Sequence, residues 1–506
     1  METSTAKFIL NTVICIVIVA GLLKVANWVW VRPKKLERQL RQQGLLGTSY
    51  KLFYGDLKEI SLMRKQALKT PMSSFSNNYI PRILPFPHRL VQEFGKDYFF
   101  WDGLTPMVNI SKPELIREVL TNIHDFQKPR MNPLADEFYA GLINYEGEKW
   151  VKHRKMIIPA FNTEKLKLML PAFYESCVEM VDKWEKIITE NGSSELDVWP
   201  DLTTLTADVI SRTAFGSSYK DGQRVFELLR EQLNMASLML QSVYFPGLRY
   251  IPTARNRKFK KAGDEIQTRL KKIIKKRKAE IEAGEATKTD LLGVLLSSNM
   301  SLQEVINECK LFYFGGQETT SLLLVWTLLL LSKHQDWQAR AREEVLLTFG
   351  NSAPDFEGLA HLKTMNMILH EVLRLYSPAI ELKRRVSKDT RLGDLSIPAG
   401  TLICLPLLFV HHDTQIWGED AQEFKPERFR EGISAATKGN ISFFPFSVGP
   451  RVCPGEKFSL IEAKMALSMI LQRFVFELSL NYVHAPMDVI LVQPQYGAQI
   501  ILRLLS

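Results

Sequence analysis

Long stretches of the chain repeat apolar residues at intervals of three and four, with charged residues between them. This spacing places the apolar side chains on one face of a helix. It predicts helices over residues 163–188, 225–240, 260–282, 334–349 and 456–474. Short β-prone runs predict strands at 106–110, 395–397 and 490–493. We therefore expect a mainly α fold with small β-sheets.

One predicted helix is longer than the others. Ser301 and Glu304 have the spacing of a capping box, in which each side chain satisfies a free backbone N–H of the first turn. The helical pattern then continues to about Lys333. Its segment Leu322–Leu331 is apolar on nearly every face and too short to span a membrane. We expect a long central helix that runs through the core.

The N-terminus carries a second apolar segment. Residues Phe8–Leu23 are apolar except for two, and about twenty apolar residues span a bilayer. Lys24 can extend its ammonium toward the interface. Trp28 and Trp30 suit that interface, and the basic cluster 32–35 favours the cytoplasmic side. A cleaved signal peptide is the alternative, but no small-residue cleavage site follows. We favour an uncleaved signal anchor.

Composition supports one large domain behind this anchor. The 506 residues include 46% hydrophobic residues, and they show no Gly/Ser-rich linker and no fixed-period repeat. We expect an anchor at 1–31, a basic and proline-containing hinge at 32–60 and one large domain at 61–506. The five cysteines are scattered and form no C-x-x-C pair, which argues against a disulfide framework or structural zinc site. The large domain is expected to face a reducing compartment.

The net charge of +10 arises partly from a basic segment at 255–278. Nucleic-acid binding would favour aromatic residues among these charges, and only Phe259 is present, so we expect no nucleic-acid partner. The segment is either a solvated helix face or a surface attracted to anionic lipid or an acidic redox partner. The apolar loop Tyr244–Leu248, just before it, is a candidate contact with membrane lipid.

The strongest chemical signal is a cysteine between glycines. Phe446, Gly449, Arg451, Cys453 and Gly455 stand in the pattern F-x-x-G-x-R-x-C-x-G. A thiolate is a strongly donating axial ligand for haem iron. Glycines let the backbone pass close to a flat macrocycle and direct N–H groups at the sulfur. The pattern matches the haem-ligand signature of the cytochromes P450.

Polar residues interrupt the long helix at 315–320. Gly315 and Gly316 each cost about 1 kcal/mol in a helix interior, and Glu318 and Thr319 are polar in an apolar element. Local rules broken together mark a functional site. The missing side chains make room for a cofactor and a small ligand, and weakened hydrogen bonding can kink the helix. The alternative is that the glycines only allow close helix packing.

Two further groups of charged residues complete the pattern. Glu371 and Arg374 are one helical turn apart in an apolar segment, and Arg428 follows in P-E-R-F, so we expect a buried scaffold cluster. Trp150 and Arg154 share a helix face. An arginine with an indole N–H can hold a haem propionate. Further propionate candidates are Arg384 and Arg451, whereas His153 is expected to pack or to lie next to a propionate rather than to bind a metal.

These motifs occur in the order typical of the cytochrome P450 family, and the resemblance covers essentially the whole chain. Segments 27–35, 43–47, 146–155, 159–161 and 479–494 resemble the plant seventy-two clan, which includes secologanin synthase and related terpenoid oxidases. The resemblance implies a P450 fold with a long central helix over haem b and the Cys453 thiolate as axial ligand. It implies oxygen activation by Thr319 and Glu318, and electrons from NADPH through NADPH–cytochrome P450 reductase.

The same resemblance implies a single-pass endoplasmic reticulum protein with a cytosolic catalytic domain and a hydrophobic terpenoid, triterpenoid or iridoid substrate. Substrate contacts are expected from 131–142, 311–319, 379–382 and around Val492. An isomerase or dehydratase acting without a reductase is an alternative, although such enzymes tend to lack the acid–threonine pair. A non-catalytic haem-binding protein is another.

The chain also departs from the family pattern. Ser447 stands where relatives often carry glycine, and Pro454 removes the N–H directly after the ligand. Gly315 replaces a common alanine, and Ser377 interrupts a double proline. We expect the change at Pro454 to affect the redox potential rather than ligation.

Overall fold

The computed structural model describes residues 2–129, 138, 140–240, 251–285 and 289–505. The chain folds as two compact units. The first contains residues 1–65, 84–129 and 383–405, and the second contains residues 66–83, 130–382 and 406–506. The boundaries predicted at residues 31 and 60 stay a prediction, and residue 60 lies inside helix α3 (Leu57–Ala67).

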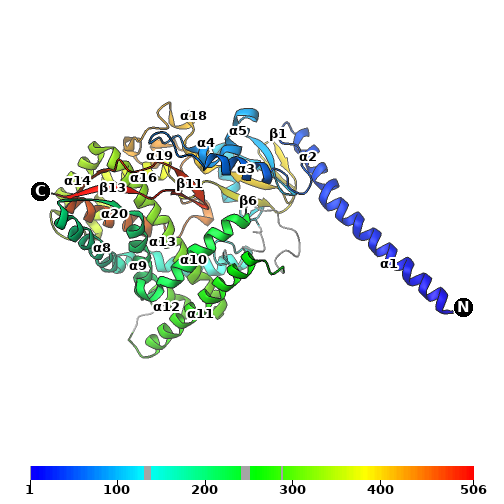
Figure 1. Ribbon diagram of the computed structural model, residues 1–506, viewed down its shortest axis with the longest axis horizontal. Helices are drawn as coiled ribbons and strands as arrows, with labels where there is room; N and C mark the ends of the chain where they lie inside the picture. Colours follow the sequence, from blue (N-terminus) through cyan, green and yellow to red (C-terminus); the bar gives the residue numbers. More distant parts are fainter. Residues whose placement is uncertain (1, 130–137, 139, 241–250, 286–288, 506) are drawn as a thin grey trace. The chain divides into compact units, whose positions relative to one another are not determined.

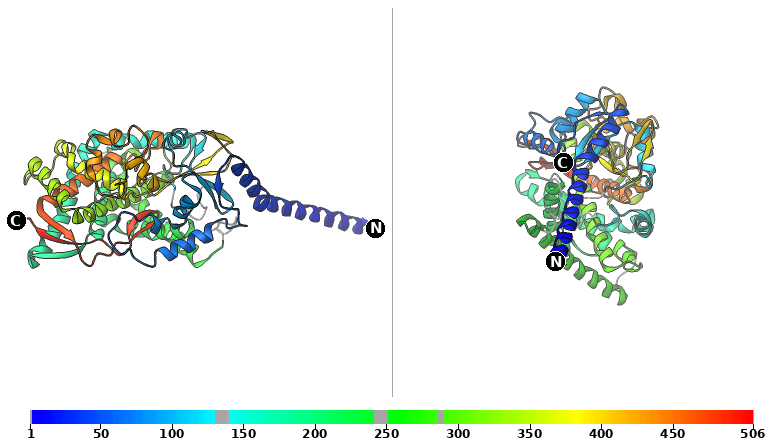
Figure 2. Two further views of the ribbon diagram at one scale, coloured as in Figure 1. Left: turned by 90° about the horizontal axis from the view of Figure 1, so that it is seen from above. Right: turned by 90° about the vertical axis from the view of Figure 1, so that its right-hand side faces the viewer.

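The first unit begins with a long apolar helix. Helix α1 (Glu2–Ala26) continues through one π-helical turn, η1 (Asn27–Val31), into α2 (Arg32–Gln42). Helix α2 packs on the sheet of this unit, whereas α1 extends away from that sheet (Figures 1 and 2). The stretch Lys7–Gln42 is long and apolar enough to cross a membrane, and its apolar window is unburied.

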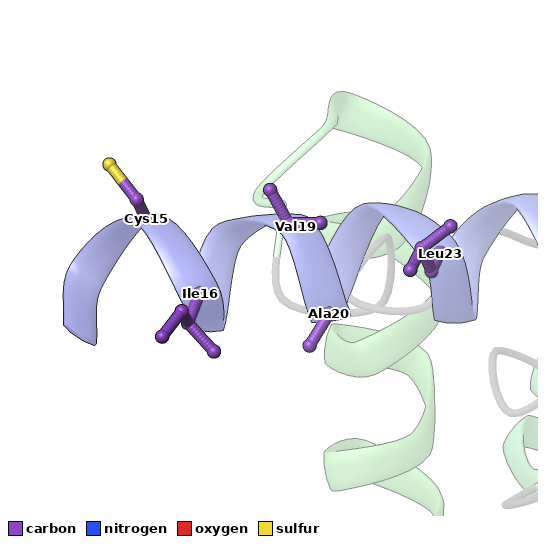
Figure 3. Close-up of a pocket in the computed structure, with 5 residues that line it drawn as sticks. All are labelled: Cys15, Ile16, Val19, Ala20 and Leu23. Carbon is purple, nitrogen blue, oxygen red and sulfur yellow. The ribbon is translucent and has the colours of Figure 1, made fainter. Parts of the chain in front are cut away.

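The middle of α1 suits a lipid environment, because no residue from Val13 to Leu23 carries a charged or amide side chain. Figure 3 shows five of these residues, Cys15, Ile16, Val19, Ala20 and Leu23, on one side of the helix. A helix that is hydrophobic all round is either buried in a core or spans a membrane. Since α1 is exposed, the predicted N-terminal apolar helix is confirmed as a candidate membrane anchor.

The main sheet of the first unit has the order β1-β2-β3-β9-β6-β4. The strands are β1 (Leu46–Gly47), β2 (Tyr98–Asp102), β3 (Thr105–Asn109), β4 (Phe126–Gln127), β6 (Leu382–Val386) and β9 (Leu402–Leu405). Strands β2 and β3 form an antiparallel hairpin, and β3 pairs with β9 in parallel. The remaining elements include α5 (Pro85–Phe94), α6 (Pro113–Thr121), β7 (Thr390–Leu392) and β8 (Leu395–Ile397).

The second unit is mainly helical. Its longer helices are α7 (Gly147–Ile157), α8 (Thr163–Asn191), α9 (Trp199–Phe215), α10 (Tyr219–Leu240), α11 (Ala254–Glu282), α13 (Leu302–Lys333), α14 (Gln335–Phe349), α16 (Lys363–Leu375) and α20 (Glu456–Arg473). Shorter ones include α4 (Ile80–Ile83), η2 (Ile158–Phe161), α12 (Leu291–Leu296), α15 (Phe356–His361), α17 (Leu407–His411), α18 (Thr414–Trp417), η4 (Pro426–Phe429), α19 (Gly432–Ala436) and η5 (Gly449–Arg451).

Two small sheets complete this unit. Strands β10 (Phe474–Leu478), β13 (Gln499–Leu504) and β5 (Ser193–Asp197) form one, and the hairpin β11 (Pro486–Val489) and β12 (Leu491–Pro494) forms the other. The predicted mainly α fold with small sheets is therefore confirmed.

Helix α13 is the centre of the second unit. Its capping box is present as predicted, with the Ser301 hydroxyl accepting from Glu304 N–H and the Glu304 carboxylate accepting from Ser301 N–H. Every residue from Thr320 to Ser332 is buried, mainly against α9, α16 and α20 (Figure 1). The long apolar helix therefore runs through the core, as its sequence predicted.

The two glycines of α13 have different neighbours. A Cβ added to Gly316 would lie 2.7 Å from the Ile210 Cγ1 of α9, whereas one added to Gly315 would meet no atom within 4 Å. Close packing therefore explains Gly316, and open space remains beside Gly315. The helix is continuous through both residues, and a kink at this point stays a prediction.

We predict that Gly316→Ala lowers the thermal unfolding temperature, because overpacking against Ile210 costs about 1–3 kcal/mol. Gly315→Ala is the matched control, since it gains up to about 1 kcal/mol of helix propensity without a clash. Far-UV circular dichroism of both variants measures the difference. Equal unfolding temperatures would contradict the packing role of Gly316.

Candidate functional site

The chain before α20 folds as a tight loop closed by backbone hydrogen bonds. The Cys453 N–H donates to the Phe446 carbonyl at 2.9 Å, and the Val452 N–H donates to the Gly449 carbonyl at 3.1 Å. Gly449 has a φ of 75°, a left-handed conformation that favours glycine. The loop ends at Gly455, the N-cap residue of α20. The local sequence therefore presents the cysteine at the N-terminus of a helix.

The Cys453 thiol is exposed, yet the surrounding protein strips it of solvation. This burial raises the pKa of the thiol, and the nearby Glu456 carboxylate raises it further. The N–H groups of Gly455 and Glu456 donate to the sulfur and, with the charge of Arg154, lower the pKa. Helix N-terminal N–H groups are a common means of stabilising a thiolate.

Ser447 lies in this loop at a strained position. Its φ of 64° is left-handed, which costs a residue with a Cβ about 1–2 kcal/mol. Its buried hydroxyl oxygen has no hydrogen-bond partner among the residues that the structure describes. The serine found where relatives often carry glycine therefore adopts a glycine-like backbone conformation without a compensating hydrogen bond.

Two guanidinium groups lie beside the Trp150 ring. The ring centroid is 4.5 Å from the Arg451 Cζ and 5.7 Å from the Arg154 Cζ. Burial lowers the pKa of Arg154, as does the neighbouring charge of Arg451. Within the described part of the chain, Arg154 has no ion pair with a carboxylate. The structure thus brings Trp150, Arg154 and Arg451 together with Cys453.

The two arginines differ in their partners. Arg451 Nη2 pairs with Glu146 Oε2 at 2.7 Å and donates to the Tyr145 carbonyl at 3.1 Å. Its charge is therefore already balanced by a carboxylate, which the sequence did not indicate. Arg384 lies on β6 of the first unit, so its role at this site stays a prediction.

The acid and the threonine of α13 are held in different ways. Glu318 is buried, and its Oε1 accepts from the Nε and Nη2 of Arg230 at 3.1 and 3.0 Å. Arg230 belongs to α10 and its side chain is 44% exposed, so it connects the buried carboxylate to the surface. The Thr319 hydroxyl donates to the Gly315 carbonyl at 2.6 Å. Arg230 thus fixes the Glu318 carboxylate, and the Thr319 hydroxyl is bonded to the backbone of α13 one turn earlier.

The charged pair on α16 is completely buried, and Arg428 of η4 lies beside it. Glu371 and Arg374 form a bidentate pair at 2.7 and 2.8 Å, and Arg428 Nε lies 3.5 Å from Glu371 Oε1. Arg374 also donates to the carbonyls of His411 and Ala421. These bonds tie α16 to the chain over residues 411–428. Removal of one charged member would leave the other charge buried without a partner, which lowers the free energy of unfolding by about 3–5 kcal/mol. A role in haem incorporation stays a prediction.

Described contacts connect several predicted substrate-contact segments. The Phe138 ring lies edge-on to Phe314 of α13 at 5.4 Å. In β12, the Val492 N–H donates to the Pro378 carbonyl at 3.0 Å, and its own carbonyl accepts from the Trp326 indole. Residues 131–137 and 139, and the predicted lipid-contact loop 244–248, lie outside the described residues. The contact roles stay predictions.

Sequence reasoning missed several partners. The sequence did not indicate that Arg230 pairs with Glu318 or that Glu146 pairs with Arg451, because the members of each pair are far apart in the sequence. Glu308 had one: it follows Glu304 by four residues, which places it on the same helix face. In the structure it is fully buried and bonds His153 at 2.7 Å. Helical periodicity could therefore have identified Glu308.

Comparison with known proteins supports the resemblance. A family model described as Cytochrome P450 matches residues 82–502. The chain is 56% identical to Cytochrome P450 72A397 of Kalopanax septemlobus, over 95% of both chains. It is 52% identical to Echinocystic acid 23-monooxygenase of Saponaria officinalis, over 98% of this chain and 99% of the relative. Cytochrome P450 72A15 of Arabidopsis thaliana is 51% identical over 99% of this chain and 100% of the relative.

We predict that Ser447→Gly raises stability. Release of left-handed strain gains about 1–2 kcal/mol, and the added freedom of glycine in the unfolded chain costs about 0.5–1 kcal/mol. Ser459→Gly, in the first turn of α20, is the control and should lower stability. Thermal unfolding measures both changes: the unfolding temperature should rise in Ser447→Gly and fall in Ser459→Gly. A loss of stability in Ser447→Gly would contradict the strain.

Proposed function

The chain belongs to the cytochrome P450 family and is a haem-dependent monooxygenase, and from this premise we propose that it oxidises a hydrophobic plant terpenoid. We propose Cys453 as the axial ligand of haem b. The observation that supports this most directly is the closed loop of Cys453, which holds the cysteine at the N-terminus of α20, where the N–H groups of Gly455 and Glu456 lower the pKa of its thiol.

The surrounding residues fit the rest of the haem. A haem carries two propionate carboxylates, and Arg154 is a half-buried cation without a carboxylate partner in the described part of the chain. We propose that Arg154 and the Trp150 indole N–H hold one propionate. Arg451 is a weaker candidate, because Glu146 already balances its charge. Arg384 stays a candidate, and Phe446, Gly449 and Gly455 shape the ligand loop.

When bound, haem with a thiolate ligand supplies the oxygen chemistry of the reaction. The protein supplies protons and excludes water. In the structure the Thr319 hydroxyl donates its proton to the Gly315 carbonyl. We propose that the hydroxyl turns away from this carbonyl to present the proton to the reacting centre. We propose that the Glu318 carboxylate takes up the replacement proton from solvent, while Arg230, which pairs with it from the surface, holds the carboxylate in place. Gly315 contributes open space rather than a functional group.

For the substrate, we favour a triterpenoid. A relative that is 52% identical is named for oxidation of echinocystic acid, which is a triterpenoid. The described contact segments are compatible with a large apolar molecule, since they carry Phe138, Leu311, Phe314, Ile380 and Val492. Iridoids and other terpenoids are the competing substrates.

We propose that electrons come from NADPH through NADPH–cytochrome P450 reductase. The apolar helix α1 would hold the enzyme in the endoplasmic reticulum membrane as a single pass. The basic residues 32–35 after it favour a cytosolic catalytic domain.

We predict that the full-length protein, reduced and treated with carbon monoxide, gives the red-shifted Soret band of thiolate-ligated haem. Cys453→Ser should lose this band, while Cys177→Ser and Cys309→Ser, which change buried thiols elsewhere, should keep it. Product formation with reductase and NADPH, tested on triterpenoid and iridoid acids, identifies the substrate class. Absence of the band in the wild-type protein would refute the haem-thiolate function.

We predict that Thr319→Val lowers product formation per NADPH oxidised by roughly 100-fold, because the proton donor is lost. Arg230→Met should lower it less, since the Glu318 carboxylate remains but loses the cation that holds it. Arg224→Met is the matched control on α10, where the arginine pairs with Glu227 at the surface. Coupling ratios measured for all three variants test the assignment, and an unchanged ratio in Thr319→Val would contradict it.

A further inference from the structure

A buried pair lies beside the site without an assigned role. His153 of α7 and Glu308 of α13 are both fully buried, and His153 Nδ1 lies 2.7 Å from Glu308 Oε1. Burial raises the pKa of Glu308, which the N–H of Leu142 and the imidazole of His153 oppose. A hydrogen-bonded pair of this kind has a defined geometry, because neither group has solvent as an alternative partner.

Glu308 also holds the segment that precedes α7. Its second carboxylate oxygen, Oε2, accepts from the Leu142 N–H at 3.1 Å. Gly141 lies so close to α13 that an added Cβ would be 3.2 Å from the Leu311 Cδ2. One carboxylate therefore fixes both a side chain of α7 and the backbone of the segment 141–146.

The other end of this segment is bound to the ligand loop. The Tyr145 carbonyl accepts from Arg451 Nη2, and Glu146 pairs with Arg451 at 2.7 Å. The Tyr145 ring lies edge-on to the His153 imidazole at 4.7 Å. The segment 141–146 thus connects α13 to the loop of Cys453, and His153 packs against its middle.

The second nitrogen of His153 faces the start of α13. His153 Nε2 lies 3.5 Å from Glu304 Oε1, which also pairs with Lys149 Nζ at 3.3 Å. Glu304 is engaged in the capping box as well. The charged groups around His153 are therefore Glu304, Glu308 and Lys149, and two of them belong to α13.

The pair also determines how α7 is rotated. Successive residues of a helix are about 100° apart around its axis. Because His153 is fixed toward α13, its neighbour Arg154 and the indole of Trp150 are directed to a defined side, where both lie beside Arg451. A rotation of α7 would change the position of the Arg154 guanidinium, whose positive charge lowers the pKa of the Cys453 thiol.

We propose that His153 and Glu308 are positioning residues, whose pairing fixes α7, the segment 141–146 and the Cys453 loop as one rigid arrangement. The pair thereby sets how firmly the site retains its haem and how the backbone at Leu142 borders the substrate region. This inference rests on the proposed haem-thiolate function. Neither residue touches the reacting atoms in this role.

The test is Glu308→Gln in the full-length holoprotein. Glutamine keeps an acceptor of similar shape but loses the charge and weakens the bond to His153. We expect backbone amide hydrogen exchange within 141–146 to accelerate roughly tenfold, and haem transfer to apomyoglobin to accelerate by about the same factor. His153→Gln, which retains a donor, should show smaller changes than His153→Leu.

Asp208→Asn is the matched control. Asp208 is also a buried carboxylate that bonds a cation, Arg212 at 2.6 Å, and a backbone N–H, that of Tyr219 at 2.9 Å. It should lower the unfolding temperature without changing exchange at 141–146 or haem transfer.

Two results would overturn the proposal. The first is that Glu308→Gln shows the same amide exchange rates within 141–146 and the same rate of haem transfer as the wild-type protein. The second is that Asp208→Asn raises these rates as much as Glu308→Gln does, which would indicate general destabilisation. If Glu308→Gln does not fold, the comparison of His153→Gln with His153→Leu decides, and equal rates in these two would overturn the pairing. Failure of the haem-thiolate function is distinguishable, because it would appear in the wild-type carbon monoxide spectrum, whereas the exchange rates still report on the pair.

Discussion

The constraint on which the second unit depends is the burial of polar groups along α13. A polar side chain on a helix this deeply buried is stabilised by a protein partner in place of solvent. Glu308 finds His153 and the Leu142 N–H, Glu318 finds Arg230, and Thr319 finds the Gly315 carbonyl. Each partner belongs to a different element, or to another turn of α13 itself. Satisfying the helix therefore arranges the elements around it.

Charge is distributed unequally over the site as a consequence. Arg451 is balanced by Glu146, and that pair serves to connect the segment 141–146 with the ligand loop. Arg154 has no such carboxylate within the described residues and therefore supplies the uncompensated positive charge near the thiol. The two arginines therefore differ in the structure: Arg451 links two segments of the protein, whereas Arg154 has no carboxylate partner among the described residues.

Much of this arrangement could be predicted, for physical reasons that vary between residues. The capping box and the apolar half of α13 are local patterns, and local patterns predicted that helix and its burial. The cysteine loop could be predicted for the same reason, since its motif lies within residues 446–455. The Glu318–Arg230 pair was not predictable, because its residues are 88 positions apart and no periodicity relates them. The two glycines show the limit within a single motif, since only the position of Ile210 separates a packing role at Gly316 from open space at Gly315.

Pro454 shows how the fold compensates for a local loss. A proline directly after the cysteine removes one N–H that could have bonded the sulfur. The loop nevertheless leads at once into α20, whose first N–H groups have no partner within the helix. Two of these, on Gly455 and Glu456, donate to the sulfur. Because the helix N-terminus supplies donors whatever residue precedes it, the hydrogen bonding of Cys453 depends on where α20 begins more than on the identity of residue 454.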